Sequence, residues 1–160
     1  MSGSKPYQEL VMASGVKVDN LVIEKYHDFK IKKNIGYLVF GFSDDISKIV
    51  VLNESLNKVP QNAPSADKNK KWEQMVDDLP ENDVRYAVID IFYDTKEGSR
   101  TEIYFISWAP DTATIKRKML IASSKDALKN ALQGIRNHIQ ATCKADLDLA
   151  AIISEKIKSK

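Results

Sequence analysis

Two apolar runs joined by a short polar stretch constrain the fold of this chain more than any other feature. Residues 85–93 (RYAVIDIFY) and 101–108 (TEIYFISW) are rich in the β-branched and aromatic side chains that favour strands. Residues 94–100 between them include Gly98 and are few enough to link two antiparallel neighbours. The chain is therefore predicted to build its sheet from hairpins, which argues against a doubly wound parallel sheet made of repeated βαβ units.

The first part of the chain is predicted to add a helix and another hairpin. Apolar side chains recur at helical spacing over residues 20–32, and Asp19 stands in the N-cap position. Residues 37–40 and 46–52 are predicted to pair as strands. Residues 53–71 are polar, contain two prolines and lack periodicity, so we expect a long surface loop there.

Further helices are predicted before and after the central hairpin. A short amphipathic helix is expected over residues 72–79, and the longest helical pattern runs from 112 to about 133 with Asp111 as its N-cap. A strand over 138–142 and a last helix capped by Asp146 complete the chain. The core stripe expected for the long helix consists of Ile115, Met119, Ala122, Leu128, Leu132 and Ile135. The predicted fold class is α/β of the mixed α+β type, with a central mixed sheet of five to six strands between helices.

Length and composition indicate one domain. The chain has 160 residues, 43% of them apolar and 29% charged, which suits a single core with an ordinary surface. Residues 1–11 are expected to be a flexible N-terminal lead, which leaves 12–160 as the folded domain. No apolar stretch approaches the roughly 20 residues of a membrane-spanning helix, and no secretory signal is recognisable. The single cysteine, Cys143, fits a reducing compartment, so we expect a cytoplasmic monomer.

No group of residues typical of catalysis or metal binding is present. Phosphate-binding glycine loops and the common hydrolase, protease and redox motifs are absent. His27 lies far from His138, and His138 with Cys143 offers two ligands where a structural zinc needs four. Asp90 is the one acid inside an apolar strand, and it is interpreted as marking the solvent face. An enzyme is therefore the weakest class, and no cofactor or metal is expected.

Positive charge is concentrated on the longest helical pattern. Residues 112–136 carry six cations and one acid, a net charge of +5, which leaves −3 for the rest of the chain. Residues 116–118 are all cations in the first turn, where the helix dipole disfavours them, so they suggest a use other than stability. An acidic partner surface would explain this charge, and a solvated helix face is the alternative. Nucleic acid is not expected as the partner, because no aromatic residues interleave with these cations.

Two further properties of this helix follow from its sequence. Ser123 and Asp126 have the S-x-x-D form of a capping box, which predicts a kink that sets two cationic clusters at an angle. Anionic lipid headgroups are attracted to clustered cations, so a phosphoinositide-binding adaptor is an alternative class. The cations that would meet such headgroups are Lys116, Arg117, Lys118, Lys125 and Lys129.

Several short motifs make the sequence resemble a known family. In order, they are S-G-V at 14–16, L-P-E-N-D at 79–83, R-Y-A at 85–87, W-A-P-D-T-A at 108–113, K-R-K-M at 116–119 and A-S-S-K-D-A-L at 122–128. Together they resemble the actin-depolymerising factor/cofilin family, over about residues 13–156. The resemblance implies a small domain that binds actin monomers and filaments, prefers ADP-actin, and severs and depolymerises filaments.

The resemblance also implies two surfaces that contact actin. The monomer site would consist of Ser14, Gly15, Val16, Lys116, Lys118, Met119, Lys125 and Asp126. The filament site would consist of Arg100, Glu155, Lys156 and Lys158. Severing needs no catalytic group, because binding that favours a differently twisted filament shifts that equilibrium.

The chain departs from the family pattern at specific positions. Glu102 stands where the family hairpin usually carries a second cation, and Ile121 stands where tyrosine is usual. Ser14 matches the serine whose phosphorylation switches the family off, although here it does not follow the initiator directly. A phosphate adds about −1.5 to −2 charge and would repel an acidic surface, whereas a terminal serine without a kinase is the alternative. Because the hairpin is altered, a coactosin-like or glia-maturation-factor-like protein that does not sever is the runner-up.

Overall fold

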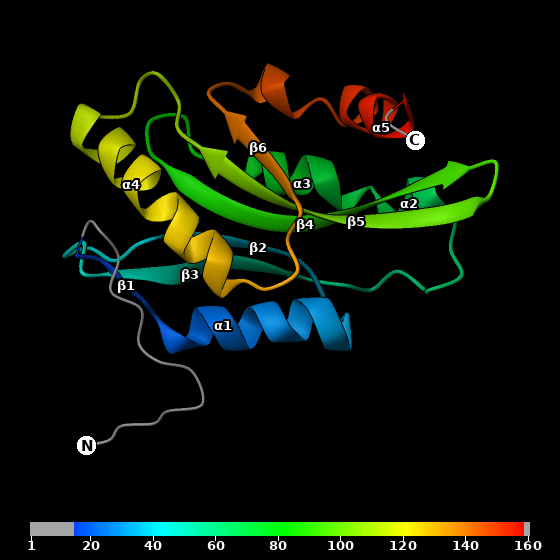
Figure 1. The fold of residues 1–160 in the computed structure, drawn as a ribbon, viewed down its shortest axis with the longest axis horizontal. Coiled ribbons are helices and arrows are strands. Elements are labelled where there is room, and N and C mark those ends of the chain that lie inside the picture. Colours follow the sequence, from blue (N-terminus) through cyan, green and yellow to red (C-terminus); the bar gives the residue numbers. More distant parts are fainter. Residues whose placement is uncertain (1–14, 159–160) are drawn as a thin grey trace.

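A six-stranded sheet in the order β1-β3-β2-β4-β5-β6 forms the centre of the molecule (Figure 1). The computed structural model describes residues 15–158, so the lead expected at 1–11 and Ser14 lie outside the described residues. The strands are β1 Lys17–Val18, β2 Ile35–Phe42, β3 Lys48–Leu56, β4 Arg85–Thr95, β5 Gly98–Trp108 and β6 Asn137–Ala141. The α-helices are α1 Asn20–His27, α2 Ser65–Lys68, α3 Lys71–Asp77, α4 Ile115–Ala131 and α5 Leu149–Lys158.

The sheet is mixed, as the sequence predicts. The four strands β3, β2, β4 and β5 are antiparallel, while β1 and β6 pair in parallel with β3 and β5 at the two ends of the order. In the central hairpin, Arg85 pairs with Trp108 and Thr95 pairs with Gly98. Both strands are therefore longer than predicted, and Gly98 begins β5 with a positive φ of 124° that favours glycine. The predicted fold class is confirmed.

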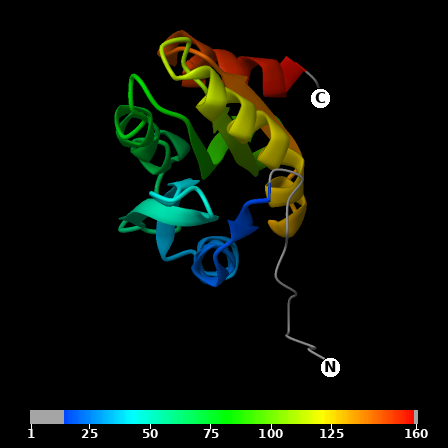
Figure 2. The ribbon, with the colours of Figure 1, turned by 90° about the vertical axis from the view of Figure 1, so that its left-hand side faces the viewer.

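Helices cover both faces of the sheet (Figure 2). Side chains along β4 alternate, with Tyr86 and Val88 in the apolar cluster beneath α1 and α4, and Ala87 and Ile89 in the cluster beneath α3 and α5. Residues 15–158 thus form two apolar cores, one on each face of the sheet. No helix in the described part of the chain is long and apolar enough to cross a membrane.

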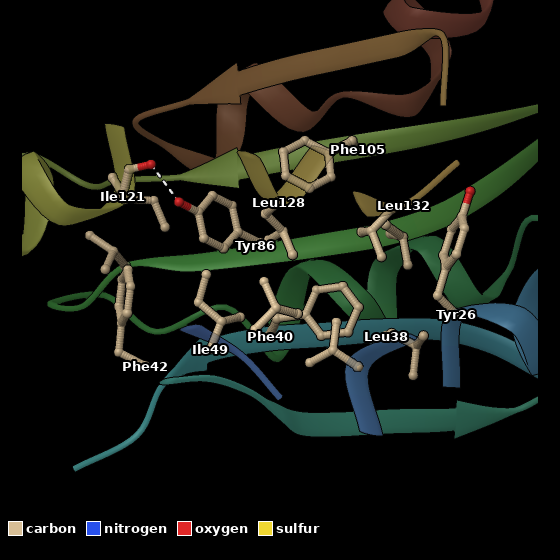
Figure 3. Packing of buried hydrophobic residues seen from close by; sticks show 14 of the residues in the cluster. Tyr26, Leu38, Phe40, Phe42, Ile49, Tyr86, Phe105, Ile121, Leu128 and Leu132 are labelled. Atoms are coloured by element: carbon tan, nitrogen blue, oxygen red, sulfur yellow. Dashed lines mark hydrogen bonds between the residues drawn. The ribbon is translucent and has the colours of Figure 1, made fainter. Parts of the chain in front are cut away.

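The position of α4 is fixed by the first of these cores (Figure 3). Ile121 and Leu128 of α4 are buried against the sheet. Tyr86 of β4 packs its ring against Phe42 and Phe105, and its hydroxyl donates a hydrogen bond to the Ile121 carbonyl. Burial raises the pKa of Tyr86 above its ordinary value, so the phenol keeps its proton and remains a donor.

The start and the middle of α4 differ from the prediction. Asp111 is not the N-cap: residues 110–113 form a separate turn, and the Thr114 hydroxyl accepts from the Arg117 amide at 3.2 Å. The capping box predicted at Ser123 does not begin a second helix, because α4 runs without a break from Ile115 to Ala131. The Ser123 hydroxyl donates back within the helix instead of capping a new one, and Ser124 is buried against the sheet.

Two other predicted segments need correction. Residues 53–71 are not all loop, because β3 continues to Leu56 and α2 occupies Ser65–Lys68. The end of β3 is polar and exposed, so its sequence lacks the apolar pattern that predicts a strand. The last helix is capped by Asp148, whose carboxylate accepts from the Ala150 amide at 3.1 Å. Asp146 instead lies in a 3₁₀ turn that precedes α5.

The first predicted helix is confirmed with one change at its end. Asp19 occupies the N-cap position, although its side chain makes no capping hydrogen bond. The final turn, Asp28–Lys32, widens into a π-helix and ends at Lys33, which has a left-handed φ of 58°.

Candidate functional site

An exposed apolar pair is the most unusual feature of α4. The side chains of Ile115 and Met119 are 76% and 66% exposed, and their spacing of four residues places them on one face of the helix. The prediction that these two residues belong to the core is wrong. The buried side of α4 is formed by Ile121, Ser124 and Leu128. Large apolar side chains held together in solvent on a helix are typical of a surface that contacts another protein.

Charged residues flank this pair along α4. Lys116 is exposed between Ile115 and Met119. The Lys118 ammonium donates a hydrogen bond to the backbone carbonyl of Asp111 at 2.8 Å. This carbonyl is uncharged, so the positive charge of Lys118 is not neutralised. One to two turns further along, Lys125 is half-buried and Asp126 is exposed. The predicted monomer-site residues of α4 therefore share one helix and lie at or near its surface.

Arg117 has a different role from its neighbours. Its guanidinium forms two hydrogen bonds with the Asp83 carboxylate, at 2.9 and 3.1 Å, and lies 5.4 Å from the centre of the Phe42 ring. Burial opposes ionisation of Asp83, but hydrogen bonds from Arg117 and Arg85 outweigh it and hold the Asp83 pKa below its usual value. Arg117 thus anchors the start of α4 to the turn before β4.

The N-terminal part of the predicted monomer site is only partly described. Gly15 is exposed with a positive φ of 81°, and Ser14 lies outside the described residues. Val16 is 2% exposed and belongs to the same apolar cluster as Ile121 of α4. The Val16 side chain therefore stabilises the fold, and Gly15 is the described residue of this segment that is exposed.

The hairpin and α5 are joined on the opposite face of the sheet. The Lys156 ammonium lies 3.8 Å from the Glu102 carboxylate and donates to the Asn137 side-chain oxygen at 2.6 Å. Asn137 in turn donates to Glu102 at 3.3 Å, and the Tyr93 hydroxyl donates to the other Glu102 oxygen at 3.1 Å. This network links β4, β5, β6 and α5.

The predicted filament-site residues lie around this network. Arg100 precedes Glu102 by two residues, so the two side chains share one face of β5, and Arg100 pairs with Glu97 at 3.4 Å. Glu155 and Lys158 are exposed on α5, next to Lys156 along the chain. The structure thus brings the hairpin and the last helix together, and it pairs Lys156 with Glu102.

The sequence candidates for metal binding and acid–base chemistry are spread over residues 15–158. In that part of the chain, no three His, Cys, Asp or Glu side chains gather to hold a metal. The Nε2 atom of His138 lies 3.0 Å from the hydroxyl oxygen of Ser107. Cys143 is exposed. Asp90 forms an ion pair with Lys71 and is not a free base.

The structure also contains a basic cavity that is not predicted from the sequence. It has a volume of about 1020 Å³ and is lined by Lys30, Lys32, Lys33, Lys68 and Lys71 among others. Two short lysine-rich segments, FKIKK at 29–33 and DKNKK at 67–71, supply these side chains. The clustering of lysines in each segment could have indicated a site for an anion, but nothing in the sequence indicates that the two segments meet.

Comparison with known proteins decides the family. The family model described as cofilin/tropomyosin-type actin-binding protein matches residues 15–157. The chain belongs to the actin-depolymerising factor/cofilin family.

Individual relatives agree with this assignment over nearly the whole chain. Cofilin from Schizosaccharomyces pombe is 38% identical over 147 residues, which cover 92% of this chain and 98% of the relative. Actophorin from Entamoeba histolytica is 36% identical over 146 residues, covering 91% and 97%. The crystal structure of Streptomyces griseoflavus cofilin superposes with a TM-score of 0.75 at 31% identity, covering 90% of this chain and 98% of that one. The family resemblance noted in the sequence is confirmed.

Proposed function

We propose that this protein binds actin monomers and filaments, with preference for ADP-actin, and severs and depolymerises filaments by binding alone. The observation that carries the proposal is the exposure of Ile115 and Met119 on α4 beside Lys116. An apolar contact surrounded by cations suits a partner whose surface combines an apolar pocket with acidic side chains.

The monomer-binding surface is centred on α4. Met119 is unbranched and adapts its shape to a pocket, and Ile115 extends the apolar contact by one turn. Lys116, Lys118 and Lys125 supply positive charge that speeds encounter with an acidic surface. Asp126, and the Ser14, Gly15 and Val16 segment, complete the proposed site. Because α4 is fixed by its buried side, this surface is preorganised and little conformational entropy is lost on binding.

The filament-binding surface is proposed to comprise Arg100, Glu155, Lys156 and Lys158. It lies on the face of the sheet that carries α5, whereas α4 lies on the other face (Figure 2). A rigid sheet with a binding surface on each side can contact two neighbouring actin subunits in one fixed geometry. Binding then favours filament twists that match this geometry, and strain concentrates at the boundary with bare filament. This accounts for severing without a catalytic group.

Regulation is proposed at the monomer surface. Phosphorylation of Ser14 would add about −1.5 to −2 charge to the N-terminal part of the proposed monomer site and repel an acidic partner. Phosphoinositide headgroups would compete for the same cations, with Lys116, Lys118, Lys125 and Lys129 as their contacts. Arg117 contributes little to this second role, because its guanidinium is occupied by Asp83. We place the protein in the cytoplasm at the actin cytoskeleton.

One observation favours a second candidate, a coactosin-like or glia-maturation-factor-like protein that binds actin or phosphoinositides without severing. Lys156, a proposed filament contact, is paired with Glu102 within the molecule. An internally paired cation contributes less to an acidic partner than a free one, so filament affinity is the quantity that separates the two candidates.

Co-sedimentation with preformed actin filaments tests the proposal. We expect the protein to appear in the pellet while actin in the supernatant rises. The double variant Lys116→Ala with Lys118→Ala should lose actin binding and keep its far-UV circular dichroism spectrum. A matched variant, Lys70→Ala with Lys144→Ala, removes the same charge from exposed positions off α4 and should behave as wild type. Actin binding by the α4 variant at wild-type affinity would refute the assignment, and binding without release of actin would favour the second candidate.

A further inference from the structure

The central hairpin extends beyond the helices on one face of the sheet (Figure 1). On that face, Phe92 of β4 and Ile103 of β5 form the floor of the cavity of about 1020 Å³. The turns after α1 and residues 57–62 form its walls. The cavity is thus built by segments that are distant in sequence, and it belongs to neither of the proposed actin-binding surfaces.

The charge of the cavity lining is strongly unbalanced. Five lysines and one carboxylate line it, and that carboxylate, Asp90, is paired with Lys71. Lys30 donates to the Gln133 carbonyl at 2.9 Å, and this neutral acceptor leaves its charge uncompensated. Lys33 and Lys68 form no ion pair with any described residue. Several positive charges therefore remain in one concave space.

Two ammonium groups of the lining, that of Lys68 and that of the Asp90-paired Lys71, lie close to an aromatic ring on the floor of the cavity. The Lys68 nitrogen lies 4.9 Å from the centre of the Phe92 ring, and the Lys71 nitrogen lies 5.4 Å from it. Contact with the ring face stabilises an ammonium without neutralising it. Because the surrounding protein has a low dielectric constant, positive charges in such a concavity focus a potential that attracts anions.

We propose that this cavity binds a small soluble molecule that carries several phosphate groups. Phosphate oxygens accept hydrogen bonds from lysine ammonium groups, and a single ligand with several phosphates can reach Lys30, Lys33 and Lys68 together. The apolar floor, Phe92 and Ile103, suits the carbon ring to which such phosphates are attached. Its volume is at the upper end of the roughly 300–1,000 Å³ of small-molecule sites, which leaves room for a ring and its substituents.

The shape of the cavity favours a free molecule over a membrane surface. The Lys68 and Lys71 ammonium groups lie over the Phe92 ring in the half-buried lining of the cavity, which a small molecule can enter and a flat layer of headgroups would contact only at its rim. The exposed cations of α4 have no such enclosure. The cavity and α4 therefore differ in the anion they select, and cavity binding does not depend on actin binding.

Calorimetric titration of the full chain with inositol hexakisphosphate near 0.15 M salt tests this proposal. We expect saturable binding, which the double variant Lys33→Gln with Lys68→Gln weakens about tenfold or more through loss of two charged contacts. A matched variant, Lys48→Gln with Lys144→Gln, removes the same charge from exposed positions outside the cavity and outside α4, and it should change the affinity less than about twofold, since screening limits long-range effects. Absence of binding by the wild type, or equal weakening in both variants, would overturn the proposal.

Vesicles containing phosphatidylinositol 4,5-bisphosphate separate the two sources of phosphate. We expect the Lys33→Gln with Lys68→Gln variant to keep its vesicle binding while it loses the soluble ligand. In nuclear magnetic resonance spectra, the amides of Phe92 and Ile103 should shift on addition of inositol hexakisphosphate and not on addition of vesicles. The reverse pattern, with vesicle binding lost and the soluble ligand retained, would show that the cavity is not a site for a small molecule.

Discussion

The guanidinium of Arg117 forms two hydrogen bonds with the carboxylate of Asp83, with Nε 2.9 Å from Oδ1 and Nη2 3.1 Å from Oδ2. This bidentate pair connects the first turn of α4 to the turn that precedes β4. It explains why Arg117 of the K-R-K-M motif is half-buried while Lys116 beside it is exposed. The motif therefore combines an anchor with contact residues.

Loss of this anchor should destabilise the protein. We expect Arg117→Gln to lower the free energy of unfolding by about 1–2 kcal/mol, a value reduced by the partial exposure of Asp83. Urea denaturation followed by circular dichroism measures the change. Lys116→Gln, which removes the same charge one residue away, should alter stability by less than about 0.5 kcal/mol. Equal stabilities of the two variants would show that the pair contributes nothing to the fold.

The exposed apolar pair should matter for binding and not for folding. Ile115→Ser should change the free energy of unfolding by less than about 0.5 kcal/mol, because the side chain is already in solvent. Affinity for actin monomers should fall about tenfold, as expected for a central apolar contact. Ile157→Ser, on α5, provides the matched control and should leave monomer affinity unchanged. Fluorescence titration with labelled monomeric actin gives the affinities of both variants.

The pairing of Lys156 with Glu102 should limit filament affinity. We expect Glu102→Gln to raise that affinity about two- to fivefold, because the Lys156 charge is then available to an acidic partner. Glu24→Gln adds the same net charge at an exposed position on α1, away from Arg100 and Lys156, and should have a smaller effect. Co-sedimentation over a range of filament concentrations measures both. A decrease in affinity would show that the network is needed to shape the surface.

Stability should fall in mild acid through His138. Burial, together with the charges of Lys125 and Lys129, lowers the pKa of His138, and Asp126 opposes this shift only weakly. The unfolded chain therefore binds a proton as the pH drops below about 6.5, while the folded protein resists it, so stability decreases from pH 7 towards pH 5.5. His138→Gln should show a smaller decrease over the same interval. Denaturation at pH 7 and at pH 5.5 gives the decrease in the free energy of unfolding for the wild type and for His138→Gln. Equal decreases in the two proteins would exclude the histidine as the cause.

Negative charge at position 14 should weaken the monomer interaction. Ser14→Glu places a carboxylate next to Gly15, where it would repel an acidic actin surface. Ser14→Ala removes the hydroxyl without adding charge and should retain wild-type affinity. A titration with labelled monomeric actin distinguishes the two variants. Unchanged affinity of Ser14→Glu would exclude electrostatic control at this position.

Much of the fold follows from local sequence, because burial on both faces leaves a strong signal. The β4 and β5 runs are unmistakable for this reason. The end of β3 was missed because its exposed edge carries polar residues, as in Asn53 and Glu54, which resemble a loop. The N-cap of α5 was misplaced because Asp146 and Asp148 are both good capping residues, and the intervening 3₁₀ turn decides between them.

The candidate site was harder to predict than the fold. Helical spacing places Ile115 and Met119 on one stripe but does not say whether that stripe faces the sheet or solvent. The orientation of α4 is set by tertiary contacts, above all those of Ile121 and Leu128 with the sheet. The basic cavity depends on two segments 34 or more residues apart along the chain, and no local pattern reports such a meeting.

The separation of the two apolar cores by the sheet has a consequence for how such proteins can diverge. α4 is supported by one core and α5 by the other, so a substitution beneath one helix does not alter the packing of its counterpart. Changes on the two sides should therefore act additively, as expected for residues that share no partners. Each surface can vary in sequence at its own rate, and one can be weakened or lost while the other continues to work.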